Sequence, residues 1–161
     1  QGHRPRLIAT ARRVNNDMGP MVAQAVVQEM LLAKIDAARA NVYLLGMTFK
    51  EDCPDVRNSL PVDIVHWLEE YGITPRIVDP VADREDFRRL YQMELETDLS
   101  AVRDADCLVF LVRHQVFREL TTAQVEKMYR QVPGQQRVLI DVKGIFTEEA
   151  YAAADMRYWS L

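Results

Sequence analysis

The sequence contains few of the residues that support covalent or metal chemistry. Its 161 residues include only two cysteines, Cys53 and Cys107, and no pair of histidines lies near either of them. Such spacing matches neither a disulfide framework nor a zinc site. Neither thiol has an adjacent base that would activate it. We therefore expect reduced cysteines, no bound metal and no catalytic residue in this chain.

Long apolar runs and an excess of basic residues are also missing. The chain has no stretch of about 18 apolar residues, and its polar, arginine-rich N-terminus does not resemble a secretory signal. A net charge of -4 and a pI near 5.4 leave no basic surface of the kind that nucleic acid requires. We expect a soluble, cytoplasmic protein that binds neither nucleic acid nor a membrane.

Glycine is scarce as well, and the loop after the apolar run 42–45 contains only Gly46. A dinucleotide-binding turn uses the pattern G-x-G-x-x-G so that its backbone can approach a pyrophosphate. Asp79 ends the next predicted strand, where such units place the acid that accepts ribose hydroxyls. Because the second and third glycines are missing, we expect no NAD binding by this chain.

The composition that is present fits one globular domain with an appendage. Hydrophobic residues make up 48% and charged residues 27%, which suffices for a core without disulfides or metal. The chain does not begin with Met, and its first residues look like the middle of a longer protein. We expect a fragment.

The stretch from Asn41 to Ser59 is the most informative part of the chain, because a strand, a polar loop and a helix start follow one another in it. Its apolar run ends in Gly46, a polar loop with Lys50 follows, and a helical pattern starts after Ser59. A short uninterrupted apolar run is typical of a strand buried on both faces in a parallel sheet. Ligands of such sheets bind beyond the carboxyl ends of the strands, so this loop is the first candidate site.

Strands and helices alternate along the remainder of the chain. Further strands are predicted at 74–78, 106–112, 137–142 and 156–159, and helices at 60–71, 83–91, 98–103, 121–131 and 147–154. Residues 93–97 fit either a short edge strand or a loop. This alternation predicts a Rossmann-like, three-layer α/β sandwich with a mainly parallel sheet, preceded by a long N-terminal helix.

That N-terminal helix is predicted over 14–38, with Gly19 and Pro20 at its opening. Its apolar stripe includes Val26, but other apolar residues widen the stripe beyond one face. Two interpretations follow. The helix covers its own sheet, or it is an interface helix that contacts a second subunit or another domain.

Three predicted strand ends carry cationic or aromatic groups, namely Phe49, Lys50, Arg113, His114 and Lys143. Ammonium and guanidinium groups neutralise phosphate oxygens, so this edge suits a phosphorylated ligand, with Lys50 as the strongest candidate. For Arg113 and His114, a solvated loop pair and a ligand contact are equally compatible with the sequence.

Asp55 and Arg57 lie two positions apart in the same irregular loop. Their opposite charges can pair with each other or with backbone amides. We expect them to hold the shape of the loop that carries Lys50.

Several motifs in order resemble the UDP-glucose/GDP-mannose dehydrogenase family. The loop GMTFKEDCPDVRNS is similar to the family pattern G-x-x-F-K-x-[DN]-[TC]-x-D-x-R-x-[ST], and it is followed by VDP at 78–80, DADCLVFLVRHQVFREL at 104–120 and IDVKG at 140–144. Upstream, ARRVNNDM looks like the family's entry into its central helix. The resemblance covers almost the whole chain and is closest to the branch that acts on UDP-N-acetylhexosamines.

The resemblance implies that different parts of the protein have different functions. In this family an N-terminal domain binds NAD and carries the catalytic cysteine, a central helix mediates dimerisation, and a C-terminal Rossmann-like domain binds the UDP part of the substrate. Residues 1–38 would then be the end of the linking and dimerisation helix, and 39–161 the UDP-sugar-binding domain. Phe49 and Lys50 would contact the UDP-sugar, and Lys143 stands where many members have an arginine.

By resemblance, the parent protein is an NAD-dependent UDP-N-acetylhexosamine 6-dehydrogenase. It would oxidise the C6 hydroxyl of a gluco, galacto or manno sugar to a carboxylate for surface polysaccharide biosynthesis, as a homodimer. The NAD site belongs to the missing N-terminal domain, so this fragment alone should hold no cofactor and be inactive. The alternative is a stand-alone α/β interaction or regulatory module without a ligand.

Overall fold

The computed structural model describes the backbone of residues 5–161 and the side chains of residues 17–161. Five strands form one sheet in the order β2-β1-β3-β4-β5, and all neighbouring strands pair in parallel. The strands are β1 Val42–Leu45, β2 Arg76–Val78, β3 Cys107–Phe110, β4 Val138–Asp141 and β5 Arg157–Ser160.

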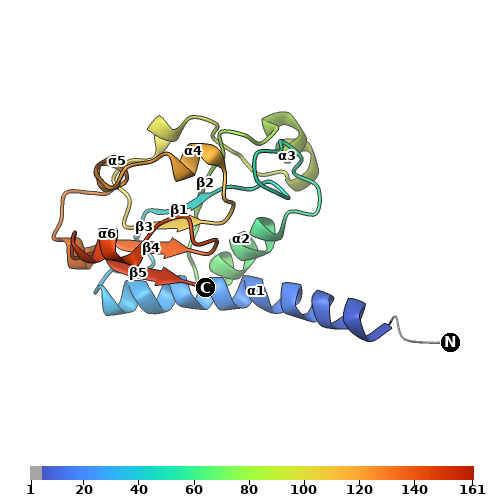
Figure 1. The fold of residues 1–161 in the computed structure, drawn as a ribbon, viewed down its shortest axis with the longest axis horizontal. Coiled ribbons are helices and arrows are strands. Elements are labelled where there is room, and N and C mark those ends of the chain that lie inside the picture. The colour runs from blue at the N-terminus through green and yellow to red at the C-terminus, as the bar shows by residue number, and fades with distance from the viewer. Residues whose placement is uncertain (1–4) are drawn as a thin grey trace.

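Helices connect these strands and precede them. They are α1 Pro5–Leu32, α2 Leu60–Glu70, α3 Arg84–Tyr91, α4 Gln115–Arg118, α5 Thr122–Glu126 and α6 Glu148–Ala152, with 3₁₀ turns at Leu99–Ala101 and Gly134–Gln136. Figure 1 shows the long helix α1 running along the sheet and extending beyond it at its N-terminal end.

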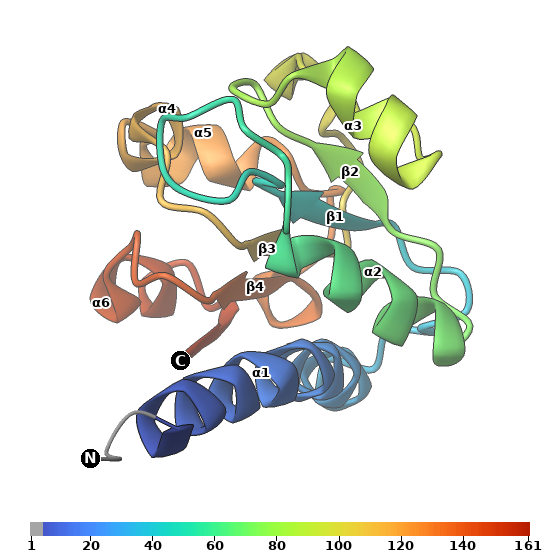
Figure 2. The same ribbon diagram turned by 90° about the vertical axis from the view of Figure 1, so that its right-hand side faces the viewer.

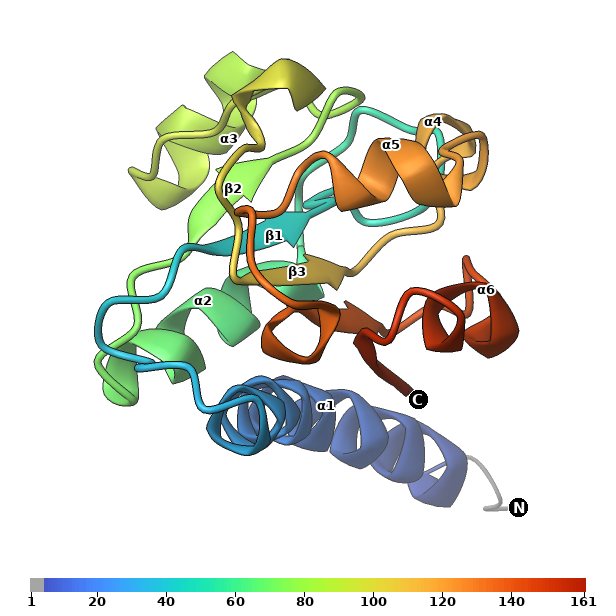
Figure 3. The ribbon, with the colours of Figure 1, turned by 90° about the vertical axis from the view of Figure 1, so that its left-hand side faces the viewer.

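The sheet is covered on both faces. Figure 2 shows α1 and α2 on one side of the sheet and α4 and α5 on the other, and Figure 3 shows the same layers from the opposite side. Because successive strand residues point to opposite faces, Leu44 and Val109 pack in the core cluster of α1 and α2. Leu45 and Phe110 pack in the cluster that includes residues of α4, α5 and α6. The predicted Rossmann-like, three-layer sandwich is confirmed.

The predicted start of the N-terminal helix is wrong. The helix begins at Pro5 rather than near residue 14, so Gly19 and Pro20 lie inside it. A Cβ atom on Gly19 would lie 3.2 Å from the indole Cδ1 of Trp67 on α2. Gly19 therefore permits close packing of α1 against α2, and the helix continues through Pro20, which donates no backbone hydrogen bond.

The predicted end of that helix, residue 38, is also wrong. The helix ends at Leu32 in a Schellman motif, in which the N–H of Ile35 donates to the carbonyl of Met30 and that of Lys34 to Leu31. Lys34 occupies the left-handed position with φ of 59°. This left-handed position is usually occupied by glycine. Because lysine stands there instead, the sequence carries no local indication that the helix ends at Leu32.

Other predicted elements are present but shorter. The predicted helix 98–103 is a 3₁₀ turn, and the predicted helix 121–131 ends at Glu126 after a capping box between Thr121 and Gln124. Residues 93–97 form a loop with a single parallel bridge between Glu96 and Val78. Within the described residues, no helix combines the length and apolar character needed to span a membrane.

Candidate functional site

The carboxyl ends of β1, β3 and β4 lie side by side, because Leu45 pairs in register with Phe110 and Phe110 with Asp141. At this edge a cavity of about 440 Å³ opens between the loops that follow the three strands and the start of α2. Its lining includes the apolar side chains of Leu60, Ile64 and Leu111. Parallel sheets place their ligands at this kind of edge.

The predicted site residues lie around this cavity. Phe49, Lys50, Arg113 and Lys143 all line it, and all four are exposed. Among the ion pairs formed by the described residues, none involves Lys50, Arg113 or Lys143. Three cations that form no ion pair with the described residues therefore surround this cavity, together with one carboxylate, that of Glu51, in a protein of net charge -4.

Gly46 brings the first of these loops close to the end of β3. Its φ is +95°, and a Cβ atom at this position would lie 2.8 Å from the Cβ of Val112. Only glycine fits such a contact in this left-handed backbone conformation. The single glycine of the loop is therefore required by packing between two strand ends.

Asp79, at the end of β2, is a structural carboxylate. Its side chain is fully buried, and it accepts hydrogen bonds from the backbone N–H groups of Met47 (2.6 Å), Val81 (2.8 Å) and Ala82 (3.1 Å). Burial raises the pKa of Asp79, but the hydrogen bonds from His114 and from the backbone outweigh this effect and hold the pKa below its usual range. A carboxylate occupied in this way is not free to accept ribose hydroxyls.

Asp141 has the same role at the end of β4. It is buried and accepts hydrogen bonds from the backbone N–H of Lys143 (3.3 Å), from that of Phe146 (2.8 Å) and from the hydroxyl of Tyr158 (3.0 Å). Burial, followed by the nearby charge of Asp141, raises the pKa of Tyr158 to about 12. Asp141 thus holds the turn that carries Lys143 at the edge of the cavity.

Asp55 and Arg57 form an ion pair within the loop after β1. Arg57 Nη2 lies 2.8 Å from Asp55 Oδ2, and Arg57 Nε lies 3.0 Å from Asp55 Oδ1. These hydrogen bonds lower the pKa of Asp55 to about 2. The backbone carbonyl of Asp55 also accepts from the N–H of Phe49 at 2.9 Å, which connects the pair to the residues at the cavity.

The structure fits neither sequence interpretation of His114. Its side chain is fully buried and does not line the cavity, whereas the neighbouring Arg113 is exposed there. The ring instead contacts the loop after β1 and the carboxylate of Asp79, with Nε2 3.2 Å from Asp79 Oδ2. The sequence contains no local sign of this burial, because the partners of His114 lie far away along the chain.

Two further features of the site were missed by sequence analysis. Asn58 lines the cavity in a left-handed conformation with φ of 52°, which asparagine tolerates better than most residues. Met18 on α1 also lines it, so the N-terminal helix contributes to the cavity wall. Asn58 could have been found from the sequence because it precedes Ser59, directly before the predicted start of α2 and at the end of the loop that carries Lys50.

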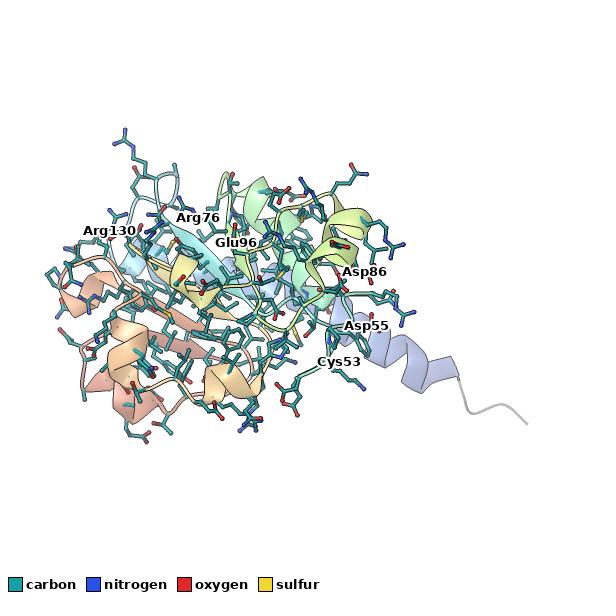
Figure 4. All side chains as sticks on the ribbon, turned by 90° about the horizontal axis from the view of Figure 1, so that it is seen from above. Cys53, Asp55, Arg76, Asp86, Glu96 and Arg130 are labelled. Carbon is teal, nitrogen blue, oxygen red and sulfur yellow. The ribbon has the colours of Figure 1, made fainter. Side chains whose placement is uncertain are left out.

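The two cysteines differ in environment. Cys107 is fully buried in β3, and burial raises its pKa well above the usual range, so its thiol is unreactive. Cys53 is half-buried in the loop after β1, and Figure 4 shows it near Asp55, beside the protruding part of α1. In the same view Arg76 and Arg130 lie on the other side of the molecule.

Comparison with known proteins identifies the family. A sequence model of the UDP binding domain of the UDP-glucose/GDP-mannose dehydrogenase family matches residues 43–148. The chain belongs to this family. The match spans β1 through the start of α6 and so includes the loops that carry Lys50, Arg113 and Lys143.

Individual relatives agree with the family assignment. The chain is 31% identical to Protein CapL of Staphylococcus aureus over 160 residues, which is 99% of this chain and 36% of CapL. It is 34% identical to the UDP-N-acetyl-D-glucosamine 6-dehydrogenase of Pseudomonas aeruginosa over 149 residues, 92% of this chain and 34% of that enzyme. The chain therefore spans about a third of the length of the relatives it matches.

A solved structure supports the fold. The NDP-N-acetyl-D-galactosaminuronic acid dehydrogenase of Methanosarcina mazei Go1 matches with a TM-score of 0.80 and 20% identity, over 99% of this chain and 32% of that one. At this identity the likeness concerns the fold alone. The Rossmann-like fold described above is therefore shared with that structure.

Proposed function

We propose that this domain binds the UDP part of a UDP-N-acetylhexosamine in the cavity at the carboxyl ends of β1, β3 and β4. The observation that carries the proposal is the group of three cations, Lys50, Arg113 and Lys143, around one cavity of the family's UDP binding domain. A diphosphate is a compact dianion or trianion, and ammonium and guanidinium groups are its usual partners in proteins.

We assign separate roles to the residues of the site. Lys50 and Lys143 neutralise the phosphates, and the exposed ring of Phe49, with 63% of its surface accessible, contacts the nucleotide sugar through its flat face. Asp55 and Arg57 keep the loop in the shape that presents Phe49 and Lys50. No residue of this chain is assigned to catalysis.

The parent protein is proposed to be an NAD-dependent 6-dehydrogenase that oxidises the sugar's C6 hydroxyl to a carboxylate. Family membership and the dehydrogenases among the relatives support this activity. The residues of this domain do not fit NAD in the dinucleotide-binding manner, because Gly46 packs against Val112 and the Asp79 carboxylate is fully occupied. We therefore assign NAD to a part of the protein outside this chain.

Nucleotide sugars are precursors of polysaccharides, so we infer that the protein takes part in surface polysaccharide biosynthesis in the cytoplasm.

We also propose that residues 1–38 belong to a helix that pairs with a second copy of the chain. The exposed side chains of Met21, Leu31 and Leu32 on α1 support this pairing, with 41%, 65% and 55% of their surfaces accessible.

Calorimetric titration of the 161-residue chain with UMP, UDP, UDP-N-acetylglucosamine and NAD tests the proposal. We expect weak binding of UDP and UDP-N-acetylglucosamine, weaker binding of UMP because it has one phosphate fewer, and no binding of NAD. Binding of NAD in place of UDP would contradict the proposed domain role. Binding of none of these ligands would favour the stand-alone interaction or regulatory module.

A further inference from the structure

His114 makes polar contacts through both nitrogens of its buried ring, and the proposed function assigns no role to it. Nδ1 accepts a hydrogen bond from the backbone N–H of Asp52 at 2.9 Å. Nε2 lies 3.2 Å from Oδ2 of Asp79 and 3.3 Å from Oγ1 of Thr48. The side chain has no exposed surface. The buried imidazole therefore has a polar partner at each ring nitrogen, and these contacts fix its position relative to Thr48, Asp52 and Asp79.

These partners determine the protonation state of the ring. The backbone N–H of Asp52 can only donate, so Nδ1 holds a lone pair and the ring proton resides on Nε2. That proton faces Asp79, which is an anion with three backbone donors of its own. The ring is therefore a neutral Nε2–H tautomer that donates on one side and accepts on the other.

The contacts of His114 join both ends of the segment 48–52, which carries Phe49 and Lys50. Thr48 at one end lies beside Nε2, and Asp52 at the other end donates to Nδ1. The Thr48 hydroxyl also donates to the carbonyl of Lys50 at 2.9 Å. Phe49 and Lys50, which line the cavity, thus lie between two residues that contact the same imidazole ring.

We propose that His114 is a positioning residue that holds the segment 48–52 in its ligand-binding conformation. The proposal rests on the proposed binding of UDP by Lys50, and His114 itself does not touch the cavity. A lysine side chain on an unrestrained loop loses more conformational freedom on binding than one whose backbone is already ordered. Loss of the ring contacts therefore weakens phosphate binding without removing any group that meets the ligand.

Other groups near the ring do not replace these contacts. The Asp52 carboxylate lies 3.7 Å from Nδ1, accepts the backbone N–H of Gln115 at 2.8 Å and lies 3.7 Å from Arg118 Nη2. The ring of Phe117 packs against the imidazole at 5.4 Å between centroids. An imidazole needed only for packing would be replaceable by an aromatic or amide side chain of similar size at no cost in ligand affinity.

Two amide variants distinguish the contact of Nδ1 with Asp52 from the contacts of Nε2 with Asp79 and Thr48. His114→Asn retains an acceptor near the position of Nδ1, and His114→Gln retains a donor near the position of Nε2. We expect His114→Gln to weaken UDP binding about tenfold, the effect of one lost hydrogen bond to the loop, and His114→Asn to weaken it less. Tyr129→Phe is the matched control, because it removes a buried 2.7 Å hydrogen bond to Val138 away from the loop.

Amide hydrogen exchange of the ligand-free chain provides a readout that does not depend on UDP. The Asp52 amide should exchange about tenfold faster in His114→Gln than in the wild type, remain protected in His114→Asn and be unchanged in Tyr129→Phe. Unchanged Asp52 protection in His114→Gln would overturn the proposal. If that variant does not fold, Thr48→Val provides the second test through faster exchange in the segment 48–52. A wild type that does not bind UDP but shows these exchange differences would overturn the proposed function and support the positioning role.

Discussion

Arg157 on β5 donates a hydrogen bond from Nε to Oε2 of Glu29 on α1 at 2.8 Å, and its Nη2 forms an ion pair with the same oxygen at 2.8 Å. The Glu29 side chain is 14% exposed and that of Arg157 34% exposed, so the pair is largely shielded from water. It joins the helix that precedes the domain to the last strand of the sheet. In Figure 1 the C-terminus accordingly lies beside the middle of α1.

Breaking this pair should destabilise the fold. Arg157→Ala leaves the Glu29 carboxylate without its partner, and we expect the free energy of unfolding to fall by roughly 1–3 kcal/mol. Chemical denaturation measures this change. Arg39→Ala is the matched control, because Arg39 pairs with Asp36 at the surface and such pairs contribute about 0–1 kcal/mol. Equal losses in the two variants would contradict the structural role of the Glu29–Arg157 pair.

Lys50 should contribute more to ligand binding than any other single residue of the loop. A charge-assisted contact with phosphate is worth roughly 1.5–3 kcal/mol, so Lys50→Ala should weaken UDP binding, and reduce kcat/KM of the parent enzyme, by about ten- to a hundredfold. Cys53→Ser should change neither quantity. Lys127→Ala, an exposed lysine after α5 and outside the cavity, is the charge-matched control. An inactive Cys53→Ser together with an active Lys50→Ala would refute this interpretation of the loop.

Asp79 should make the stability of the protein depend on pH. Because its pKa is lower in the folded protein than in the unfolded chain, its stabilising effect is full above the unfolded pKa of about 3.9 and is lost as the pH falls through the folded pKa. Asp79→Asn should therefore be less stable than the wild type at pH 7, and the difference should shrink as the pH falls below the unfolded pKa. Urea denaturation at several pH values measures it.

Asp104→Asn is the control for that series. Asp104 is exposed in a left-handed turn that asparagine also tolerates, and its side chain forms none of the hydrogen bonds recorded among the described residues. We expect its stability to follow the wild type at every pH. A constant difference between Asp79→Asn and the wild type across the range would argue against a lowered pKa of Asp79.

The pairing of α1 with a second copy predicts a concentration-dependent mass. Val26 is fully buried against the chain's own sheet, so a charge there would test the fold rather than an interface. Leu31 lies on the exposed face, and Leu31→Glu should shift light-scattering masses from dimer toward monomer because a buried charge without a partner is costly. Leu90→Glu on α3, also an exposed leucine, should leave the mass unchanged. A wild type that is monomeric at high concentration would exclude the pairing.

Local sequence patterns were sufficient to identify the strands and the loop that bears Lys50. The runs at 42–45 and 107–110 are short and apolar, 138–141 is apolar up to Asp141, and each is a fully buried strand. Because parallel strands all end at one edge, the sequence placed Phe49, Arg113 and Lys143 at the same edge of the sheet. That β1, β3 and β4 are neighbours there was decided by the structure. The strand positions themselves depend on residues that are close in sequence.

Tertiary contacts decided the roles of the buried polar groups and the bounds of α1. His114 meets Asp52 across 62 positions of the chain, and Asp79 meets Met47 across 32, so no local pattern distinguishes these side chains from solvated loop residues. Likewise, α1 continues through Pro20, and the neighbouring Gly19 lies against Trp67 of another helix. Composition and periodicity determined which segments became strands, whereas the free energy of burying polar groups with their distant partners determined which loop residues turned inward and which remained at the cavity.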